Sequence, residues 1–516
     1  MPVIVLRNRR ATRTLRRRPG PFALFLAAIL GTVFIPPLFA SAGDLPITLD
    51  DAVRLAIANN LALRAASFDP AVAESGARRA HGIYDVQLTS LLDFRGEDDK
   101  PTPVAPDAER KRFFDANVAA ERLLPSGATA SVAFTNLFSR DNLGMPTSHF
   151  AKPALSVSLS QPLLQGFGRD VTEKGIITAR LSSDAAASDW RAKAQATVAD
   201  ARDGFFTLLA ARSNLETRKI SLETARRLHA QNEARVRAGL LASIELLDSA
   251  FGVAQRQKDL LDAEKAVRDA EDGLRVLLQI PAEEHLVPAE PGIPSEAAPG
   301  GQEAVAAALA HRPEIISARL ALRTAEFNAQ VAGNAVLPSL ALTGSAGVSG
   351  LGSDYGRALD DLGSGKYPSW AAGLSFSFPI GNAAAREDLA ASRLKARQAR
   401  VSLRSLEESI GLEVRSALRD LETRKKQIDV AGKGLELAEA RFASYLERAR
   451  IGLATTKDTL QAESDRVAAR NALVTARTDL QGALTRLWKS TGELLDRHGI
   501  RIGNEEIREM IEKETR

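Results

Sequence analysis

The sequence predicts a mostly helical α+β protein, in which long antiparallel coiled-coil helices follow short groups of strands and the whole arrangement occurs twice. Proline is absent between Pro162 and Pro281 and again after Pro379, and both stretches are rich in Ala, Leu, Arg and Glu, which favour helix. Short segments elsewhere alternate apolar and polar residues, as strands do. Related residue patterns recur in the same order, which indicates an internal duplication.

The duplication can be followed along the chain. Asp51–Val53 reappears as Glu303–Val305, and Gly239 reappears as Gly452. The distance in sequence from Gly239 to Gly452 is shorter than the distance from Asp51 to Glu303. The first copy therefore holds additional residues between Asp51 and Gly239. The segment Pro281–Gly301, rich in Pro, Gly and Glu, forms the expected linker between the copies.

The segment 1–42 differs in composition from the rest of the chain and is predicted to be a secretory signal peptide. It holds seven arginines and no acidic residue, and an apolar stretch over 21–35 precedes the cleavage pattern Ala40-Ser41-Ala42. The apolar stretch is shorter than a spanning helix requires, so a membrane anchor is the weaker interpretation. The formal net charge of +4 becomes −3 without this segment, which disfavours a nucleic-acid-binding surface.

The expected order of segments is the same in both copies. Each copy begins with an opening helix, continues into strands and ends in one long helical hairpin. In the first copy these segments are residues 43–85, 86–165 (with an insert) and 166–280; after the linker over 281–301 they are residues 302–336, 337–380 and 381–495, and a tail follows over 496–516.

The strands alternate large apolar residues with small polar ones. The apolar positions, each separated from the next by a serine, are Leu155, Val157 and Leu159 in the first copy and Leu374, Phe376 and Phe378 in the second. A period of two gives each strand one apolar and one polar face. The apolar face could meet a soluble core, or it could meet lipid in a barrel with a polar interior. The pattern alone favours neither interpretation.

The long hairpins carry a seven-residue apolar repeat, which is typical of a coiled-coil seam. The repeat includes Leu208 and Leu215 in the first copy and Leu421 and Ile428 in the second. A helix over Ile176–Val236 would be roughly 90 Å long at 1.5 Å per residue. We therefore expect an elongated rod in each copy and not a compact domain.

Each rod is expected to end at a glycine. Gly239 and Gly452 follow basic last turns, which is how many helices terminate. Second helices are expected to return over Ile244–Gln279 and Lys457–Trp488. Each copy thus places a tight helix–turn–helix tip far from its strands.

Four segments and both glycine turns carry a resemblance to a known family. The segments are Ile47–Val53, Ser160–Gly168, His311–Ile315 and Phe378–Asn382. In their duplicated order they resemble the TolC-like outer membrane factors, also called outer membrane efflux proteins. The resemblance runs from about Ile47 to Leu495, although Leu61 stands where the family often has proline.

The resemblance implies a homotrimer located in the outer membrane with a periplasmic extension. The long helices would form a periplasmic α-barrel, and four strands from each protomer would form one shared outer-membrane β-barrel. Closing the barrel across subunits would satisfy every strand edge, as a bilayer requires. The alternating apolar residues named above, Leu155, Val157, Leu159, Leu374, Phe376 and Phe378, would then face outer-membrane lipid.

One segment departs from this scheme. The stretch between the outer strands is far longer in the first copy than in the second. The extra piece contains the strand-like segments Asn117–Arg122 and Thr129–Phe138, joined by a turn at Leu124–Gly127. It could be an extracellular hairpin or additional barrel strands, and both interpretations stay open at this point.

The resemblance also points to the hairpin tips. Family members carry acidic rings at the periplasmic entrance, which match Asp458 and its repeat equivalent Glu245. Asp248 completes the predicted gate residues, but its repeat equivalent is Gln461, so one ring position of the family is lost. Crowded carboxylates attract cations and raise each other's pKa. The alternative is that they are solvated acids near a helix N-terminus, where acids are favoured. The tip residues Gly239, Leu240, Ala242, Gly452, Leu453 and Thr455 are the expected docking surface for a periplasmic adaptor.

The predicted function is a passive exit duct of a tripartite efflux pump or a type I secretion system, whose inner-membrane pump is of the resistance–nodulation–division or ABC type. No enzyme, cofactor or metal site is expected, because the six histidines are scattered and no Walker, dinucleotide or nucleophile-elbow motif occurs. The alternative function is a soluble periplasmic coiled-coil scaffold, in which the strands form an ordinary sheet.

Overall fold

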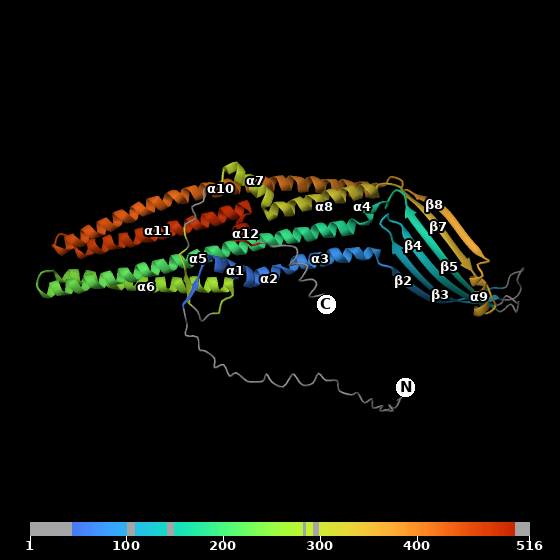
Figure 1. The fold of residues 1–516 in the computed structure, drawn as a ribbon, viewed down its shortest axis with the longest axis horizontal. Coiled ribbons are helices and arrows are strands. Elements are labelled where there is room, and N and C mark those ends of the chain that lie inside the picture. The colour runs from blue at the N-terminus through green and yellow to red at the C-terminus, as the bar shows by residue number, and fades with distance from the viewer. Residues whose placement is uncertain are drawn as a thin grey trace, which may run out of the picture.

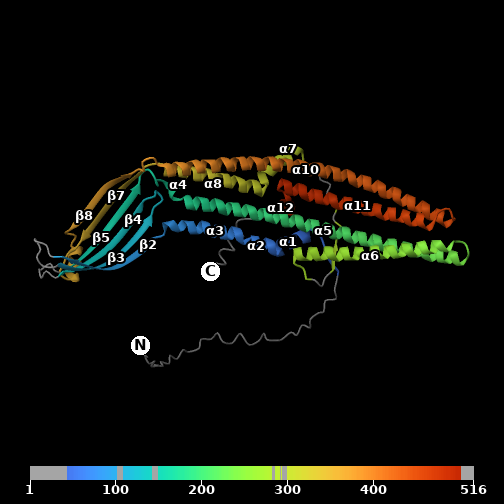
Figure 2. The same ribbon diagram turned by 180° about the vertical axis from the view of Figure 1, so that it is seen from behind.

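The computed structural model describes residues 44–100, 109–141, 149–281, 285–290, 292 and 299–500. The predicted signal peptide and the part of the tail beyond residue 500 lie outside these residues. The described chain is elongated, with an antiparallel sheet at one end, helices along the body and two helical hairpin tips at the other end (Figure 1 and Figure 2).

The stretch expected to be the first opening helix contains several short elements. They are β1 (Asp44–Ile47), α1 (Leu49–Asn59), α2 (Leu61–Ala66), α3 (Phe68–Ala80) and the 3-10 helix η1 (His81–Tyr84). The break between α1 and α2 lies at Asn60, whose side-chain oxygen accepts a hydrogen bond from the Leu63 N–H at 2.9 Å. Asparagine is a preferred N-cap residue, so it begins a new helix here.

The expected rods are present in both copies. The first copy has α4 (Arg169–Thr172), α5 (Lys174–Arg237) and α6 (Ser243–Leu278), and the second has α10 (Ala383–Arg450) and α11 (Thr456–Thr491), followed by α12 (Leu494–Arg497). The second opening helix is divided into α7 (Gly301–His311) and α8 (Pro313–Ala335). With 64 and 68 residues, α5 and α10 are about 96 and 102 Å long. None of the helices in the described part of the chain combines the length and the apolar character needed to cross a membrane.

The two tips end their rods with the same motif. Gly239 has a φ of 71° and Gly452 has a φ of 81°, a left-handed conformation that glycine adopts without strain. In the first tip the Leu240 N–H donates to the Arg235 carbonyl at 2.8 Å, and in the second the Leu453 N–H donates to the Arg448 carbonyl at 2.8 Å. These are Schellman motifs at equivalent positions, so the duplication extends to the hydrogen bonds that end the helices.

The sheet has six strands in the order β2-β3-β4-β5-β7-β8, and every neighbouring pair is antiparallel. The strands are β2 (Gln87–Asp99), β3 (Glu109–Leu123), β4 (Thr129–Asp141), β5 (His149–Pro162), β7 (Ser339–Ser349) and β8 (Pro368–Ser377), with helix α9 (Tyr355–Gly363) between the last two. The insert therefore forms two sheet strands, β3 and β4, and the expectation of four strands in each protomer is wrong. The second copy contributes only β7 and β8.

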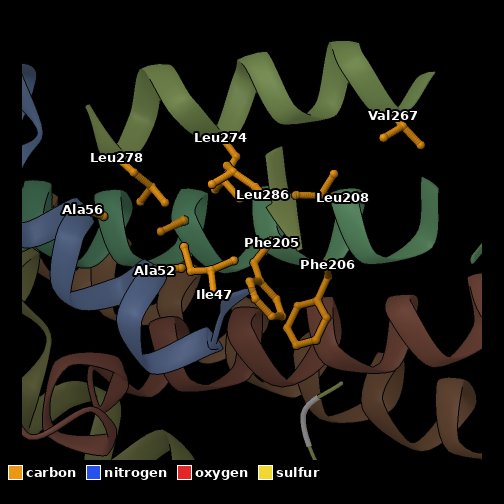
Figure 3. Packing of buried hydrophobic residues seen from close by; sticks show 11 residues of the cluster. Ile47, Ala52, Ala56, Phe205, Phe206, Leu208, Val267, Leu274, Leu278 and Leu286 are labelled. Carbon is orange, nitrogen blue, oxygen red and sulfur yellow. The ribbon is translucent and has the colours of Figure 1, made fainter. Parts of the chain in front are cut away.

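A small parallel sheet that the sequence analysis did not predict ties the start of the described chain to the linker. Strand β1 pairs with β6 (His285–Pro288), so that Leu45 is opposite Leu286. Around it lies the apolar cluster shown in Figure 3, in which Ile47, Phe205 and Leu278 are each at most 2% exposed. This cluster fixes α1 and the end of α6 against the middle of α5. Leu208, a predicted seam residue, belongs to it.

Candidate functional site

The sheet has one continuous apolar face that crosses all six strands. Residues directly opposite each other in the ladders share a face. Val157 of β5 pairs with Val132 of β4 and with Ala346 of β7. The same row continues to Ala120 on β3 and Leu88 on β2 in one direction and to Trp370 on β8 in the other. The apolar positions of separate strands, including the inserted pair, thus form a single surface.

The opposite face of the sheet carries mostly polar and small residues, with Leu91, Phe113 and Leu137 on β2–β4 as exceptions. Ser156 and Ser158 of β5 pair with Gly347 and Ser345 of β7, and Ser375 of β8 lies opposite Ala341. The hydroxyls of Ser158 and Ser131 hydrogen-bond across the ladder at 2.7 Å. A soluble sheet of this kind would bury its apolar face, but here that face is exposed.

The structure places the predicted lipid-facing residues on the exposed apolar face, with one correction. Leu155, Val157 and Leu159 are exposed on β5, and Leu374 and Phe376 are exposed on β8. Phe378 is also exposed, but it lies one residue beyond the end of β8. Pro379 follows it and has no N–H to continue a ladder, and Gly381 then turns the chain with a φ of 90°.

A row of aromatic rings crosses the inserted strands and was missed by the sequence analysis. The ring of Phe94 on β2 lies 4.8 Å from that of Phe114 on β3, Phe114 lies 5.6 Å from Phe138 on β4, and Phe138 lies 5.4 Å from Tyr355 on α9. Distances are between ring centroids. Membrane barrels carry such aromatic girdles where the apolar band meets the interface. The alternation of residues along β2 and β3 could have indicated that Phe94 and Phe114 lie on one face of the sheet.

At the other end of the molecule, the gate residues lie at the N-terminal ends of α6 and α11. Asp458 is exposed and forms a capping box with Thr455, whose N–H donates to the carboxylate at 3.2 Å. Hydrogen bonds from the Thr455 side chain and backbone hold the pKa of Asp458 below its usual range. Glu245 reaches from the first hairpin to the second, where it accepts a hydrogen bond from the Thr456 N–H at 2.8 Å. Asp248 is partly exposed, one turn further along α6.

Glu245 and Asp458 therefore both cap the first turn of α11, one from each hairpin. A helix N-terminus presents unpaired N–H groups and a positive partial charge, which stabilise carboxylates there. Both residues are predictable from the sequence as site residues, but their shared role depends on a contact between the two hairpins. Their arrangement as a ring concerns a trimer and stays a prediction.

Further contacts join the two hairpins near their tips. The Asn232 side chain donates to the Thr456 hydroxyl at 2.7 Å, and Arg235 donates to the Ala449 carbonyl at 2.9 Å. Deeper in the bundle, Arg256 of α6 and Glu463 of α11 form a buried ion pair at 2.8 Å. This pair was not among the predicted site residues, although charged residues at positions facing another helix could have indicated it.

The six predicted docking residues are all exposed at the tips: Gly239, Leu240, Ala242, Gly452, Leu453 and Thr455. Leu240 and Leu453 are each 73% exposed, and they occupy equivalent positions after the two glycines. An open groove lies between the tips and is lined by residues that include Leu228, Leu241 and Leu446. The tips thus present a duplicated apolar surface to the solvent.

An exposed two-faced antiparallel sheet, joined to long paired helices that end in hairpin tips, defines the class of tunnel-forming outer-membrane channels. The chain belongs to the outer membrane efflux protein family, whose model matches residues 109–278 and again residues 304–493. One match falls in each copy, as the duplication predicts. Proteins of this family are transport channels and not enzymes. Within the described residues, no group of three His, Cys, Asp or Glu side chains could hold a metal ion.

Two curated relatives have similar sequences. The chain is 28% identical over 201 residues to the outer membrane efflux protein BepC of Brucella suis, a match that covers 39% of this chain and 43% of that protein. It is 25% identical over 319 residues to the pyoverdine export outer membrane protein OpmQ of Pseudomonas aeruginosa, covering 58% and 62%. The chain thus spans less than two thirds of the length of either relative.

Solved structures share the fold. The outer-membrane channel OprN is 18% identical with a TM-score of 0.66, and the match covers 86% of this chain and 90% of OprN. The CmeC outer membrane channel of Campylobacter jejuni is 18% identical with a TM-score of 0.64, covering 90% and 89%. At this level of identity the likeness establishes the fold.

Proposed function

We propose that this protein is a trimeric channel-tunnel of the outer membrane, which serves as the exit duct of a tripartite efflux pump or a type I secretion system. The observation that carries the proposal is the six-stranded sheet, whose apolar face is continuous and exposed while its other face carries mostly small, polar and charged residues. Lipid covers such an apolar face, and water fills the space behind the polar one.

The geometry of the helices fits a duct that crosses the periplasm. The rods extend about 100 Å from the sheet towards the tips, with the exposed leucines of both tips at the far end. Transport through such a duct is passive. Energy comes from an inner-membrane pump of the resistance–nodulation–division or ABC type, which a periplasmic adaptor connects to the tips.

Adaptor docking is assigned to the surface around Leu240 and Leu453. These equivalent leucines lie beside the inter-hairpin groove, so that one adaptor hairpin can contact both tips through apolar side chains. Cysteines at Ala242 and Thr455 would trap an adaptor by crosslinking in intact cells. Absence of any crosslink at both positions would contradict the assignment.

The gate is assigned to Glu245 and Asp458, with Asp248 behind them. Threefold symmetry brings six carboxylates, Glu245 and Asp458 from each subunit, to one constriction, which favours cations and binds divalent ions. We expect Glu245→Gln combined with Asp458→Asn to reduce cation selectivity and divalent block in single-channel recordings. Asp262→Asn combined with Glu264→Gln is the matched control, because it removes two carboxylates from the middle of α6, away from the tips. Unchanged selectivity and block in the double variant would contradict the gate.

The proposed function itself is tested by fractionation and by conductance. The full-length protein should stay in the outer membrane after a high-salt wash, migrate as a trimer in mild detergent and form ion channels in planar bilayers. A soluble periplasmic scaffold would be released by the wash and would form no channels, and this result would overturn the proposal.

A further inference from the structure

The β3–β4 hairpin is an integral part of the sheet. Strand β3 pairs with β2 over the whole length of β2, from Gln87–Glu121 to Asp99–Glu109. Strand β4 pairs with β5 from Thr129–Ser160 to Arg140–His149. The hairpin therefore lies between β2 and β5 with ladders on both sides, and it cannot fold away as an extracellular loop without dividing the sheet.

The inserted strands also follow the two-faced pattern of the others. On the apolar face, Phe114, Val118 and Ala120 of β3 lie opposite Phe138, Phe134 and Val132 of β4. The other face is mainly polar: Glu121 and Asp115 of β3 and Ser131 and Ser139 of β4 lie on it, with Phe113 and Leu137 as the large apolar exceptions. The inserted strands thus present one face to lipid and the other to the lumen, as β5, β7 and β8 do.

Strands β2 and β8 are the two edges of the sheet in the described chain. Every described side chain of β2 and all ten residues of β8 are exposed, whereas β3, β4, β5 and β7 contain partly buried side chains. An unpaired edge leaves a row of N–H and C=O groups without partners, which a bilayer does not tolerate. Six strands are too few to close on themselves, since the smallest membrane barrels have eight. The missing partners must come from another chain.

The directions of the two edges fit each other. Strand β2 leads away from α3 and β8 leads back to α10, so the two edge strands run in opposite directions. When β8 of one copy is placed beside β2 of the next, the antiparallel alternation continues without interruption. An odd number of strands would give parallel edges and would break the alternation.

We propose that each protomer contributes six strands to the barrel wall, that β8 of one copy pairs with β2 of the next, and that the trimer forms an eighteen-stranded barrel. This inference rests on the proposed trimeric channel. Barrel diameter grows roughly linearly with strand number, so this wall is about 1.5 times as wide as one built from four strands per protomer. The outer pore therefore admits larger solutes than a twelve-stranded barrel.

Cysteine crosslinking tests the seam directly, because the chain has no native cysteine. Ser90→Cys on β2 is combined in turn with Ala372→Cys, Leu374→Cys or Phe376→Cys on β8. Within one protomer these positions lie on opposite edges of the sheet, five strand spacings or about 24 Å apart, which is beyond disulfide reach. Oxidation should therefore give covalent dimers and trimers for one of the three pairs.

Register provides an internal check. When Leu92→Cys replaces Ser90→Cys, the preferred β8 position should move by two residues towards the N-terminus, as an antiparallel ladder requires. Val132→Cys with Val157→Cys, opposite each other inside one protomer, is the positive control that crosslinks without forming oligomers. Trimers that pass the fractionation test but give no β2–β8 crosslink in any combination would overturn the inference and leave the proposed function standing.

Pore width is measured with a four-strand variant, in which residues 100–148 are replaced by a short loop that joins β2 directly to β5. Polyethylene glycols of increasing size are added on the extracellular side, and the largest polymer that enters the pore is read from conductance. The variant should reduce the limiting polymer radius about 1.5-fold. An unchanged limiting radius would show that β3 and β4 are not part of the wall. Loss of all channels from the full-length protein would instead overturn the proposed function.

Discussion

The two faces of the sheet predict opposite effects of one substitution at neighbouring positions. Val157 lies in the central strand β5, is 53% exposed and has the apolar neighbours Val132 and Ala346 on either side. Ser156 is adjacent in sequence and lies on the polar face opposite Gly347, which leaves room for a longer side chain. We expect Val157→Arg to destabilise the inserted channel strongly and Ser156→Arg to be tolerated.

The size of the difference follows from where the new charge lies. An arginine on the lipid face of a membrane barrel costs about 2–4 kcal/mol at the midplane of the bilayer. Val157 is midway along the apolar residues of β5, between Leu155 and Leu159, so the full value applies. A trimer carries the substitution three times, and the summed cost is about 6–12 kcal/mol. Ser156→Arg places its charge in water and avoids this desolvation cost.

Denaturant titration of the protein refolded into lipid vesicles gives the two free energies of unfolding. Val157→Arg should lower the midpoint or abolish insertion, whereas Ser156→Arg should insert and shift the ion selectivity of the pore towards anions. Equal destabilisation by both variants would contradict the assignment of the faces. A larger cost for Ser156→Arg would reverse it.

Three further predictions concern the helical body, each measured by thermal or urea unfolding of the detergent-solubilised protein. Gly239→Ala should destabilise by about 1–2 kcal/mol because alanine disfavours the left-handed conformation, while the control Gly273→Ala, inside α6 with open space around it, should not destabilise. Arg256→Met should cost about 3 kcal/mol, because the buried Glu463 carboxylate loses its hydrogen-bonded partner and keeps the more distant Arg466 guanidinium at 3.7 Å; adding Glu463→Leu should restore most of the loss. Burial and the nearby Arg202 charge lower the pKa of His498. Its contribution to the free energy of unfolding is therefore present above about pH 6.5 and should fall as the pH drops through the lowered pKa. His498→Gln should remove this pH dependence, and a variant whose stability varies with pH as in the unchanged protein would contradict the prediction.

The long helices could be predicted from sequence because several local signals agree. The expected helix over Ile176–Val236 matches α5 to within two residues at each end, and the expected Ile244–Gln279 matches α6 to within one. Absence of proline indicates the extent of the helical hairpin, and a basic last turn followed by Gly239 indicates where α5 ends. The positions of the tips, and therefore of the candidate docking and gate residues, follow from these local rules.

Features that depend on contacts between distant residues could not be predicted in this way. Strands β1 and β6 are short, and β1 lies at the start of the first copy whereas β6 lies in the linker, so neither a period nor a turn indicates their pairing. The link from Glu245 to the Thr456 N–H joins different copies, and no sequence spacing encodes it. The alternation in the insert was visible, but only the ladders to β2 and β5 decide between an extracellular hairpin and sheet strands.

The position of the insert explains how one copy can gain strands while the helical body keeps its duplicated form. One added strand would reverse the direction of the chain and place the start of α4 at the wrong end of the sheet. Two added strands return the chain to the same end, where the β3–β4 turn contacts the beginning of the helices: the Gly168 N–H donates to the Ser126 carbonyl at 3.1 Å, and the Ser126 hydroxyl bonds to the Gln161 side chain at 2.7 Å. A complete hairpin is therefore the smallest addition that widens the sheet without displacing α5, and the unequal strand numbers of the two copies are compatible with equal helical hairpins.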